Sequence, residues 1–278
     1  MGNSYLQTRV LIDGLNQVDA ILEPKGTQLE DSEERQKLAR CFAPISRDEF
    51  MSIAFTASEY EETAAIIKTH APEVLPHIKR PVLENDFTVV GHGRLDLPFR
   101  VITPDRRSIR HTLRDGTFVQ GAQIASKHNL LYSNGLIRIP ADNGKGVYLY
   151  QPADPSMADA TEMAAAMFKT RGEVSTKGLT VSFPKARTER LPDYQWVTQL
   201  RSKDDKFRVE SFIGTGEAIL NEKGFFTRET QVIEVLVFCV TTGLPLTSID
   251  GPFFAFFADD TGVHAAAWFD HDSFSPYE

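Results

Sequence analysis

The stretch PFFAFFADDTGVHAAAWF, residues 252–269, decides the fold class of this chain. Two apolar runs, residues 253–257 and 263–269, lie on either side of a short polar segment. Runs that lack a polar residue at every second position are typical of strands that are covered on both faces. We therefore expect these runs to be interior strands of a large sheet.

Further strands are expected in the preceding residues, where turn signals separate short apolar runs. The signals are Asp115-Gly116, Asn134-Gly135 and Asn143-Gly144, which favour the tight turns of antiparallel hairpins. The runs with strand character are residues 87–90, 118–124, 136–139, 147–150, 179–183 and 231–240. The second half of the chain is therefore expected to be rich in antiparallel sheet.

Helical patterns dominate the beginning of the chain. Ser46 and Glu49 form a capping box at the start of one predicted helix, and Pro24 ends the helix before it. The segments with helical spacing of apolar residues are 6–22, 46–72 with a break near Ser58, and 156–172. The polar stretch 25–40 is expected to be a loop or a short exposed helix.

The order of helices first and strands later indicates an α+β fold. The chain has 278 residues, of which 41% are hydrophobic and 19 are phenylalanine, enough for a substantial core. We predict a single domain over residues 1–278, with a helical N-terminal part, residues 1–75, and a sheet-rich part, residues 85–278.

The charge balance excludes several classes of partner. A formal net charge of -8 at pH 7 repels nucleic-acid phosphates and anionic membranes on average, so neither is expected to bind. One basic cluster is interpreted as a solvated face without a role: Arg106, Arg107, Arg110, His111 and Arg114. Because no leader or membrane-length apolar segment is recognised, the prediction is an intracellular protein.

Motifs of known catalytic chemistry are not found, including the nucleophile elbow, the phosphate-binding loop and the zinc-protease helix. His92 and Asp96 are the best candidates for an acid and base, but such neighbours are commonplace. A possible metal site near the end of the chain is interpreted as a solvated face; its residues are His264, His271, Asp259, Asp260, Asp270 and Asp272. We predict no enzyme, no cofactor and no metal.

Several segments resemble motifs of the serpin family, and they occur in the family's order. The most specific is Val181-Ser182-Phe183-Pro184-Lys185, which is similar to the family's V-S-L-P-K. Further similar segments are Phe42-Ala43-Pro44-Ile45-Ser46, His92-Gly93-Arg94-Leu95-Asp96-Leu97-Pro98-Phe99, the hairpins at 115–124, 136–140 and 147–152, Ile233-Glu234-Val235, and 252–257. The resemblance covers the chain from about Arg40 to Pro276.

This resemblance implies a miniaturised serpin-like fold, with helices followed by large, mostly antiparallel sheets. The family carries several more helices and two more strands between the helix ending near His70 and the strand at Thr88. A proline-rich connection stands there in this chain. The predicted fold therefore lacks several family helices.

The resemblance also bears on the reactive loop. Inhibitory serpins present a long loop that inserts as a new central strand once it is cut. Here only residues 236–251 separate the Ile233-Glu234-Val235 match from Pro252, and bulky residues 236–240 stand where an inhibitor has small ones. The predicted remnant of this loop is Cys239, Val240, Thr241, Thr242, Gly243, Leu244, Pro245 and Leu246.

The function implied by the resemblance is that of a non-inhibitory serpin-like protein that acts by binding another protein, of the kind a virus or other pathogen would use to modulate its host. Two alternatives stay open. One is a reversible protease inhibitor that presents Leu244 and Pro245. The other is a structural or assembly subunit, for instance of a virion.

Overall fold

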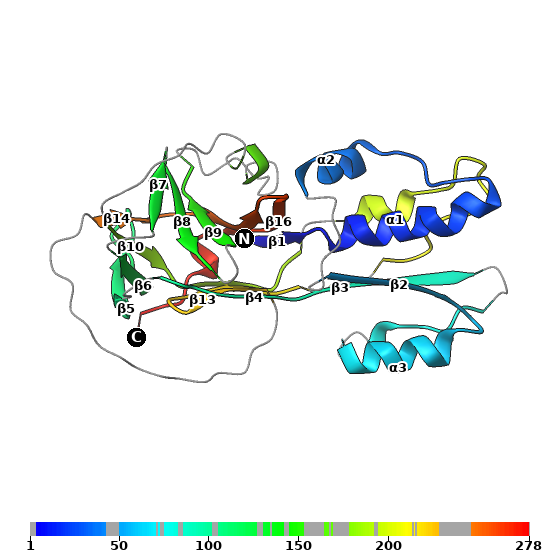
Figure 1. Cartoon of the computed structure of the whole chain (residues 1–278), viewed down its shortest axis with the longest axis horizontal. Coiled ribbons are helices and arrows are strands. Elements are labelled where there is room, and N and C mark those ends of the chain that lie inside the picture. Colours follow the sequence, from blue (N-terminus) through cyan, green and yellow to red (C-terminus); the bar gives the residue numbers. More distant parts are fainter. Residues whose placement is uncertain are drawn as a thin grey trace.

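The structure is a computed structural model of the chain (Figure 1). It describes residues 4–42, 50–70, 72, 75–82, 86–101, 105–126, 130–133, 135–141, 145–152, 164–166, 168, 178–191, 194–212, 214, 216–227 and 246–277. Helices and antiparallel sheets are both present, which confirms the predicted α+β class. No described helix is long and apolar enough to cross a membrane.

The largest sheet has six strands and brings the two ends of the chain together. Its order is β1 (Tyr5–Thr8), β16 (Gly262–Phe269), β15 (Phe253–Asp259), β9 (Gly146–Tyr150), β8 (Leu136–Pro140) and β7 (Leu131–Ser133). The two apolar runs predicted as interior strands are β15 and β16, which pair antiparallel with Phe254 opposite Trp268. That prediction is confirmed, since both strands have a neighbour on each side.

The two faces of β15 point into different hydrophobic clusters. Phe253 and Phe257 belong to the cluster shared with the other sheets, whereas Phe254 and Phe256 pack with residues of the first helices. All four rings are fully buried. Each such burial is worth about 1.5–3 kcal/mol, which explains why this strand carries no polar alternation.

A second sheet has four strands in the order β14 (Leu246–Ser248), β10 (Leu179–Pro184), β6 (Phe118–Ser126) and β5 (Asp105–Thr112). The predicted turns at Asp115-Gly116 and Asn134-Gly135 join β5 to β6 and β7 to β8. Gly116 and Gly135 have φ values of 86° and 81°, which glycine adopts without strain. The predicted antiparallel pairs β5–β6, β7–β8 and β8–β9 are confirmed, whereas Asn134 and the turn residues Asn143 and Gly144 lie outside the described residues.

The remaining sheets are smaller. One has the order β11 (Ala186–Thr188), β12 (Ala218–Leu220), β13 (Gly224–Thr227) and β4 (Leu95–Pro98), and the other pairs β2 (Phe50–Thr56) with β3 (Phe87–Gly93). In Figure 1 the helices α1 (Val10–Leu22) and α2 (Glu33–Cys41) lie on one side of β2 and β3, and α3 (Tyr60–His70) lies on the other. The short 3-10 helices are η1 (Glu23–Lys25), η2 (Leu75–His77), η4 (Gln195–Gln199) and η5 (His271–Ser273).

Two predicted helices were wrong in their first residues, which form strands. Residues 5–8 pair with β16, so the first helix begins only at Val10. Residues 50–56 pair with β3 along their whole length, and the second helix begins at Tyr60. Helical spacing of apolar residues cannot exclude a strand over one or two turns, and pairing with residues far along the chain decided both cases.

The other helix predictions have mixed outcomes. The polar stretch after η1 contains α2, which Ser32 caps by accepting a hydrogen bond from the Arg35 backbone N–H at 3.1 Å. The capping box at Ser46 and Glu49 lies outside the described residues. Of the predicted helix at 156–172, the structure describes residues 164–166 and 168, which are helical.

Candidate functional site

The centre of the β11–β12–β13–β4 sheet is occupied by a short strand, β13. It runs antiparallel to both neighbours, with Phe226 opposite Ile219 of β12 and opposite Asp96 of β4. The side chain of Phe225 is fully buried. Because β13 has a strand on each side, its backbone is paired on both edges in the uncut chain.

A tight turn, residues 221–224, leads from β12 into β13. The Asn221 backbone N–H donates to the Gly224 carbonyl at 3.1 Å, and the Asn221 side chain accepts from the Lys223 N–H at 2.8 Å. The Lys223 carbonyl in turn accepts from the Phe99 N–H at 2.9 Å. The turn is thus attached both to itself and to the end of β4.

Two further features hold this turn in place. Lys185 and Glu222 form an ion pair of 2.8 Å, and their side chains are only 18% and 21% exposed. Gly224 lies so close to β4 that a Cβ atom there would be 2.4 Å from the Leu97 carbonyl oxygen and 2.9 Å from the Pro98 Cα. A larger residue would push β13 away from β4.

The next described strand after β13 is β14, the edge strand of the second sheet. Thr180 of β10 lies opposite Leu246, and the Ser182 hydroxyl donates to the Ser248 hydroxyl at 3.0 Å. The Ile249 N–H donates to the Ser182 carbonyl at 2.8 Å, which extends the attachment. The side chain of Leu246 is 63% exposed.

The predicted loop remnant falls in the connection between β13 and β14, residues 228–245. Leu246 is the first residue of β14, and the other seven predicted residues, Cys239 to Pro245, lie outside the described residues, as does the Ile233-Glu234-Val235 match. The described strands that bracket the connection end at Thr227 and begin at Leu246. We call residues 228–245 the connecting segment.

The bounds of β13 and β14 bear on the inference from the sequence that the loop before Pro252 is too short. The last described strand before β14 ends well before residue 236, where the sequence analysis began the loop, so the topology gives no support to a loop that is too short. Bulky residues occur at the start of β13 as well as at residues 236–240. Phe225 and Phe226 directly follow Gly224, and Phe225 is already buried within the sheet.

The sequence-predicted metal candidates serve structural roles. His264 is fully buried, and its Nε2 lies 3.1 Å from both the Asp259 Oδ1 and the Thr261 hydroxyl. The Asp270 carboxylate accepts from the Asp272 N–H at 3.2 Å, so it caps η5. Among the described residues, no group of three or more His, Cys, Asp or Glu side chains is arranged to hold a metal ion.

The pKa of Asp259 reflects this arrangement. Burial by itself would raise the pKa, but hydrogen bonds from Thr261 and His264 stabilise the carboxylate and lower the pKa to about 2. The interpretation of this end of the chain as a solvated face is wrong for His264. The Asp259 carboxylate accepts from the Thr261 N–H at 2.9 Å in the β15–β16 turn, and the imidazole stacks on the Phe257 ring.

The other sequence candidates are also placed. Asp96, the proposed partner of His92, forms an ion pair of 2.8 Å with Arg94. In the basic cluster, Arg107 and Arg110 are exposed as expected, but His111 is buried and lies 2.6 Å from the Ile249 carbonyl. Burial lowers the pKa of His111, and the Ile249 bond and the Asp250 charge act in the opposite direction. The cluster is therefore not a uniform solvated face.

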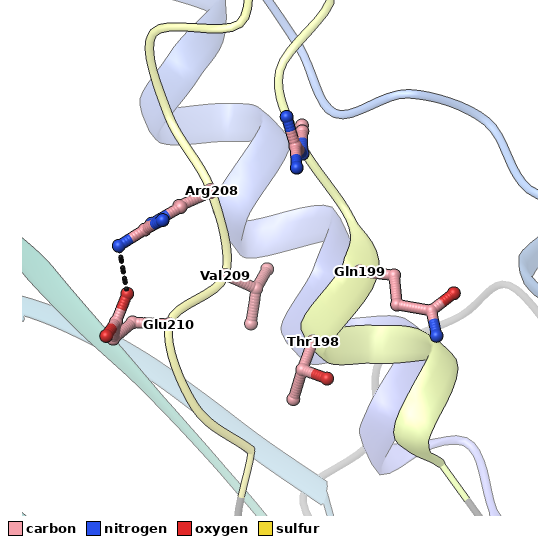
Figure 2. Close-up of a pocket in the computed structure, with 6 residues that line it drawn as sticks. Thr198, Gln199, Arg208, Val209 and Glu210 are labelled. Atoms are coloured by element: carbon pink, nitrogen blue, oxygen red, sulfur yellow. Dashed lines mark ion pairs between the residues drawn. The ribbon is translucent and has the colours of Figure 1, made fainter.

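A shallow depression of about 430 Å³ lies between η4 and the extended segment that follows it (Figure 2). Thr198 and Gln199 line one side, and Arg208, Val209 and Glu210 line the other. Arg208 and Glu210 pair with each other at 3.0 Å, and both are more than 70% exposed. Without a buried polar group, this depression lacks the features of a small-molecule site.

Comparison with known proteins places the whole fold. No protein-family model and no curated protein matches the sequence. Among solved structures, a cleaved Serpin 42Da matches 99% of this chain and 92% of its own, with a TM-score of 0.55 and 10% identity. SRPN18 from Anopheles gambiae matches 100% of this chain and 94% of its own, with a TM-score of 0.53 and 13% identity. The chain has a serpin-like fold.

Another solved structure with this serpin-like fold is human thyroxine-binding globulin, described as complexed with its hormone. It matches 95% of this chain and 91% of its own, with a TM-score of 0.50 and 11% identity. Proteins with this fold therefore include a small-molecule binder. At identities this low, the structural similarity establishes the fold alone. The activity has to be argued from the site itself.

The strand predicted over residues 231–240 lies outside the described residues. One of the strands that were not predicted from the sequence is β13. The signal was the sequence Ala218-Ile219-Leu220 followed by Asn221-Glu222-Lys223-Gly224 and then Phe225-Phe226-Thr227. Two short apolar runs separated by asparagine and glycine are a hairpin signal, as at the three turns that were recognised. The described residues between α3 and β3 contain η2 and no α-helix or strand, as expected for the proline-rich connection.

Proposed function

We propose that this serpin-like protein is a non-catalytic binding protein that engages a protein partner through the connecting segment and does not trap proteases covalently. The observation that supports this most directly is β13. The first residues after the β12 turn already form a paired, central strand in the uncut chain.

Strand insertion supplies the energy for covalent trapping, so an occupied position weakens that mechanism. The place between β12 and β4 is filled by β13, and Phe225 is buried there. The free energy of strand pairing that is present before cleavage cannot be gained again after cleavage. Less free energy is therefore available to displace a protease after the loop is cut.

The attachment of the connecting segment favours recognition of a partner. Its two ends are strands of different sheets, β13 at the centre of one and β14 at the edge of another. A segment tied at both ends loses less conformational entropy on binding than a free chain end. Its sequence contains the apolar run Val235-Leu236-Val237-Phe238, a composition suited to burial against another protein.

The test is incubation of the purified protein with a panel of serine and cysteine proteases, followed by denaturing electrophoresis. We expect no complex that survives the detergent, whereas an inhibitory serpin run in parallel forms one. Such a complex with any protease would refute the proposal. A protease that is inhibited reversibly, with a preference altered by Leu244→Arg, would instead establish the reversible inhibitor.

The binding role is tested separately by affinity capture with the wild type and two variants. Leu236→Ser with Val237→Ser removes apolar side chains from the connecting segment, and the matched variant Ile66→Ser with Val82→Ser removes exposed apolar side chains elsewhere. A partner of the connecting segment is lost with the first variant and kept with the second. Equal capture by all three proteins would contradict the proposal.

A further inference from the structure

We propose that the free edge of β5 is a docking site for an extended acidic peptide of a partner protein, which adds to the sheet as a fifth strand. The site consists of the β5 edge with Arg107 and Arg110 and of the aromatic residues Phe118 and Tyr277. None of its residues belongs to the connecting segment, so it is an additional surface for a protein partner.

Alternate backbone groups of β5 point away from its partner strand β6. Its partner β6 uses the Gln120 N–H and carbonyl to bond Ser275 and Lys185, both at 2.8 Å, on the side away from β5. Gln120 is opposite Arg110, and bonding alternates along an antiparallel pair. The outward peptide groups of β5 are therefore those of Arg106, Ser108, Arg110 and Thr112, and no described strand pairs with them.

The hairpin turn gives the same alternation independently. The Leu113 N–H donates to the Thr117 carbonyl at 2.8 Å, so the residues of β5 that bond β6 are those at odd positions. Ser108, Arg110 and Thr112, at even positions, are all exposed. An incoming strand therefore meets a row of backbone donors and acceptors that no described strand uses, as in the recognition of peptides by strand addition.

The arginine side chains of β5 make its edge basic. Arg107 and Arg110 are exposed and have no carboxylate partner among the described residues. The Arg107 Nε donates to the Gln123 side chain at 2.7 Å, which fixes the guanidinium and leaves its terminal N–H groups available. In the adjoining turn, Asp115 accepts from the Thr117 N–H at 2.9 Å. The edge is thus locally basic on a chain whose net charge is -8.

Arg110 lies against two aromatic side chains, Phe118 and Tyr277. Its guanidinium lies 3.5 Å from the centre of the Phe118 ring and 5.4 Å from that of Tyr277. Both rings are nearly half exposed, at 47% and 48%. A stacked guanidinium keeps the N–H groups at its rim for a carboxylate, with its orientation already fixed. Figure 1 shows β5 beside the C-terminal end of the chain, which supplies Tyr277.

These positions specify the peptide. Arg107 and Arg110 are three residues apart, so their side chains emerge on opposite faces of the sheet. An added strand reaches both with acidic residues that are also three apart, because its own side chains alternate in the same way. Two acids that are two positions apart share one face and meet only one arginine.

The experiment measures fluorescence anisotropy of a labelled octapeptide rich in Thr and Val, with Glu at its third and sixth positions. Control peptides carry Lys at both positions, or Glu at the third and fifth, or N-methyl groups at alternate residues. We expect the first peptide to bind about tenfold more tightly than each control, since paired charge-assisted bonds and backbone pairing are both required. Equal binding of the N-methylated peptide would exclude strand addition.

Protein variants locate the site. Arg107→Glu with Arg110→Glu is expected to weaken binding about tenfold or more, while Arg201→Glu with Arg208→Glu, an equal charge change elsewhere, leaves it within about twofold. Ser108→Pro removes one outward donor without touching the bonds to β6, and Ser108→Ala is its control. An equal loss with both charge-reversal variants, or no loss with Ser108→Pro in a folded protein, would overturn the proposal.

Discussion

Gly224 is the residue at which the chain enters the central strand, and it has no space for a side chain. Two of the three nearest atoms to such a Cβ belong to the backbone of β4, the Leu97 carbonyl oxygen at 2.4 Å and the Pro98 Cα at 2.9 Å, and the third is the Phe226 Cζ at 2.9 Å. A flexible side chain could move aside, but a paired backbone cannot do so without disturbing the sheet. The fit of β13 between its neighbours therefore depends on the absence of this one side chain.

The substitution Gly224→Ala should lower the free energy of unfolding by about 1–3 kcal/mol, the cost typical of overpacking. Gly14→Ala is the matched control. Its Cβ would lie 4.0 Å from the Val89 Cγ1, within ordinary contact, and alanine favours the helix α1 by up to about 1 kcal/mol. Urea unfolding of both variants measures the difference, and an unchanged stability of Gly224→Ala would show that β13 is not held against β4.

His264 shows why the interpretation of this end of the chain as a solvated face was wrong. His264 and Asp259 are separated by a turn, and nothing in their order indicates whether they face water. The two side chains meet at 3.1 Å with the imidazole fully buried, on paired strands whose register shifts between Phe257 and Ala258. Burial is a property of the assembled sheet, so composition near the turn could not supply it.

At the scale of elements, the decisive feature is that β13 lies between β12 and β4 in the uncut chain. Asp96 and Phe226 are directly opposite residues on the paired strands, and Thr227 is opposite Leu95. Side chains at opposite positions point to the same face and have Cβ atoms within the reach of a disulfide. Those at diagonal positions one residue apart point to opposite faces.

An engineered disulfide can therefore report the register. In a chain with Cys41→Ser and Cys239→Ser, the pair Asp96→Cys with Phe226→Cys should oxidise readily, and the pair Asp96→Cys with Thr227→Cys should not. Thiol titration and mass spectrometry of peptides from the intact, uncut protein detect the bond. Failure of the first pair in a folded chain, or equal oxidation of both, would mean that residues 224–227 are not inserted in this register.

Element predictions from the sequence succeeded where the signal is local. The hairpins at Asp115-Gly116 and Asn134-Gly135 were recognised because a tight turn needs particular residues within the turn itself. The strands β1 and β2 were taken as the first turns of helices, because their apolar spacing satisfies both periods. Tyr5 pairs with Trp268 and Phe50 with Gly93, and such distant partners leave no mark on a short window of sequence.

For the whole molecule, the question is how much stability cleavage of the connecting segment would release. Residues 224–227 are paired already, so a cut chain has less new pairing to form. With a recognition site for a sequence-specific protease in place of residues 239–245, we expect cleavage to change Tm by no more than about 5 °C, which corresponds to about 3 kcal/mol in a chain of this size. Calorimetry before and after the cut measures this change.

The control for that measurement is the same protein exposed to catalytically inactive protease. A rise in Tm several times larger than the expected limit would show that the connecting segment inserts further once it is cut. In that case the protein stores energy as an inhibitory serpin does, and the proposal of a non-trapping binding protein would be abandoned. A fall in Tm without unfolding is consistent with the loss of a covalent tie between two sheets.

The sequence by itself determined the α+β class, the covered strands β15 and β16, the local hairpins and the serpin-like order of motifs. Each of these depends on hydrophobic pattern or on turn residues that are neighbours in the chain. Only the tertiary structure decided that β13 is inserted, that His264 is buried and that no described strand pairs with the outer edge of β5, where Arg107 and Arg110 are exposed. Those features depend on which distant strands become neighbours, since pairing and burial are energies of the whole assembly.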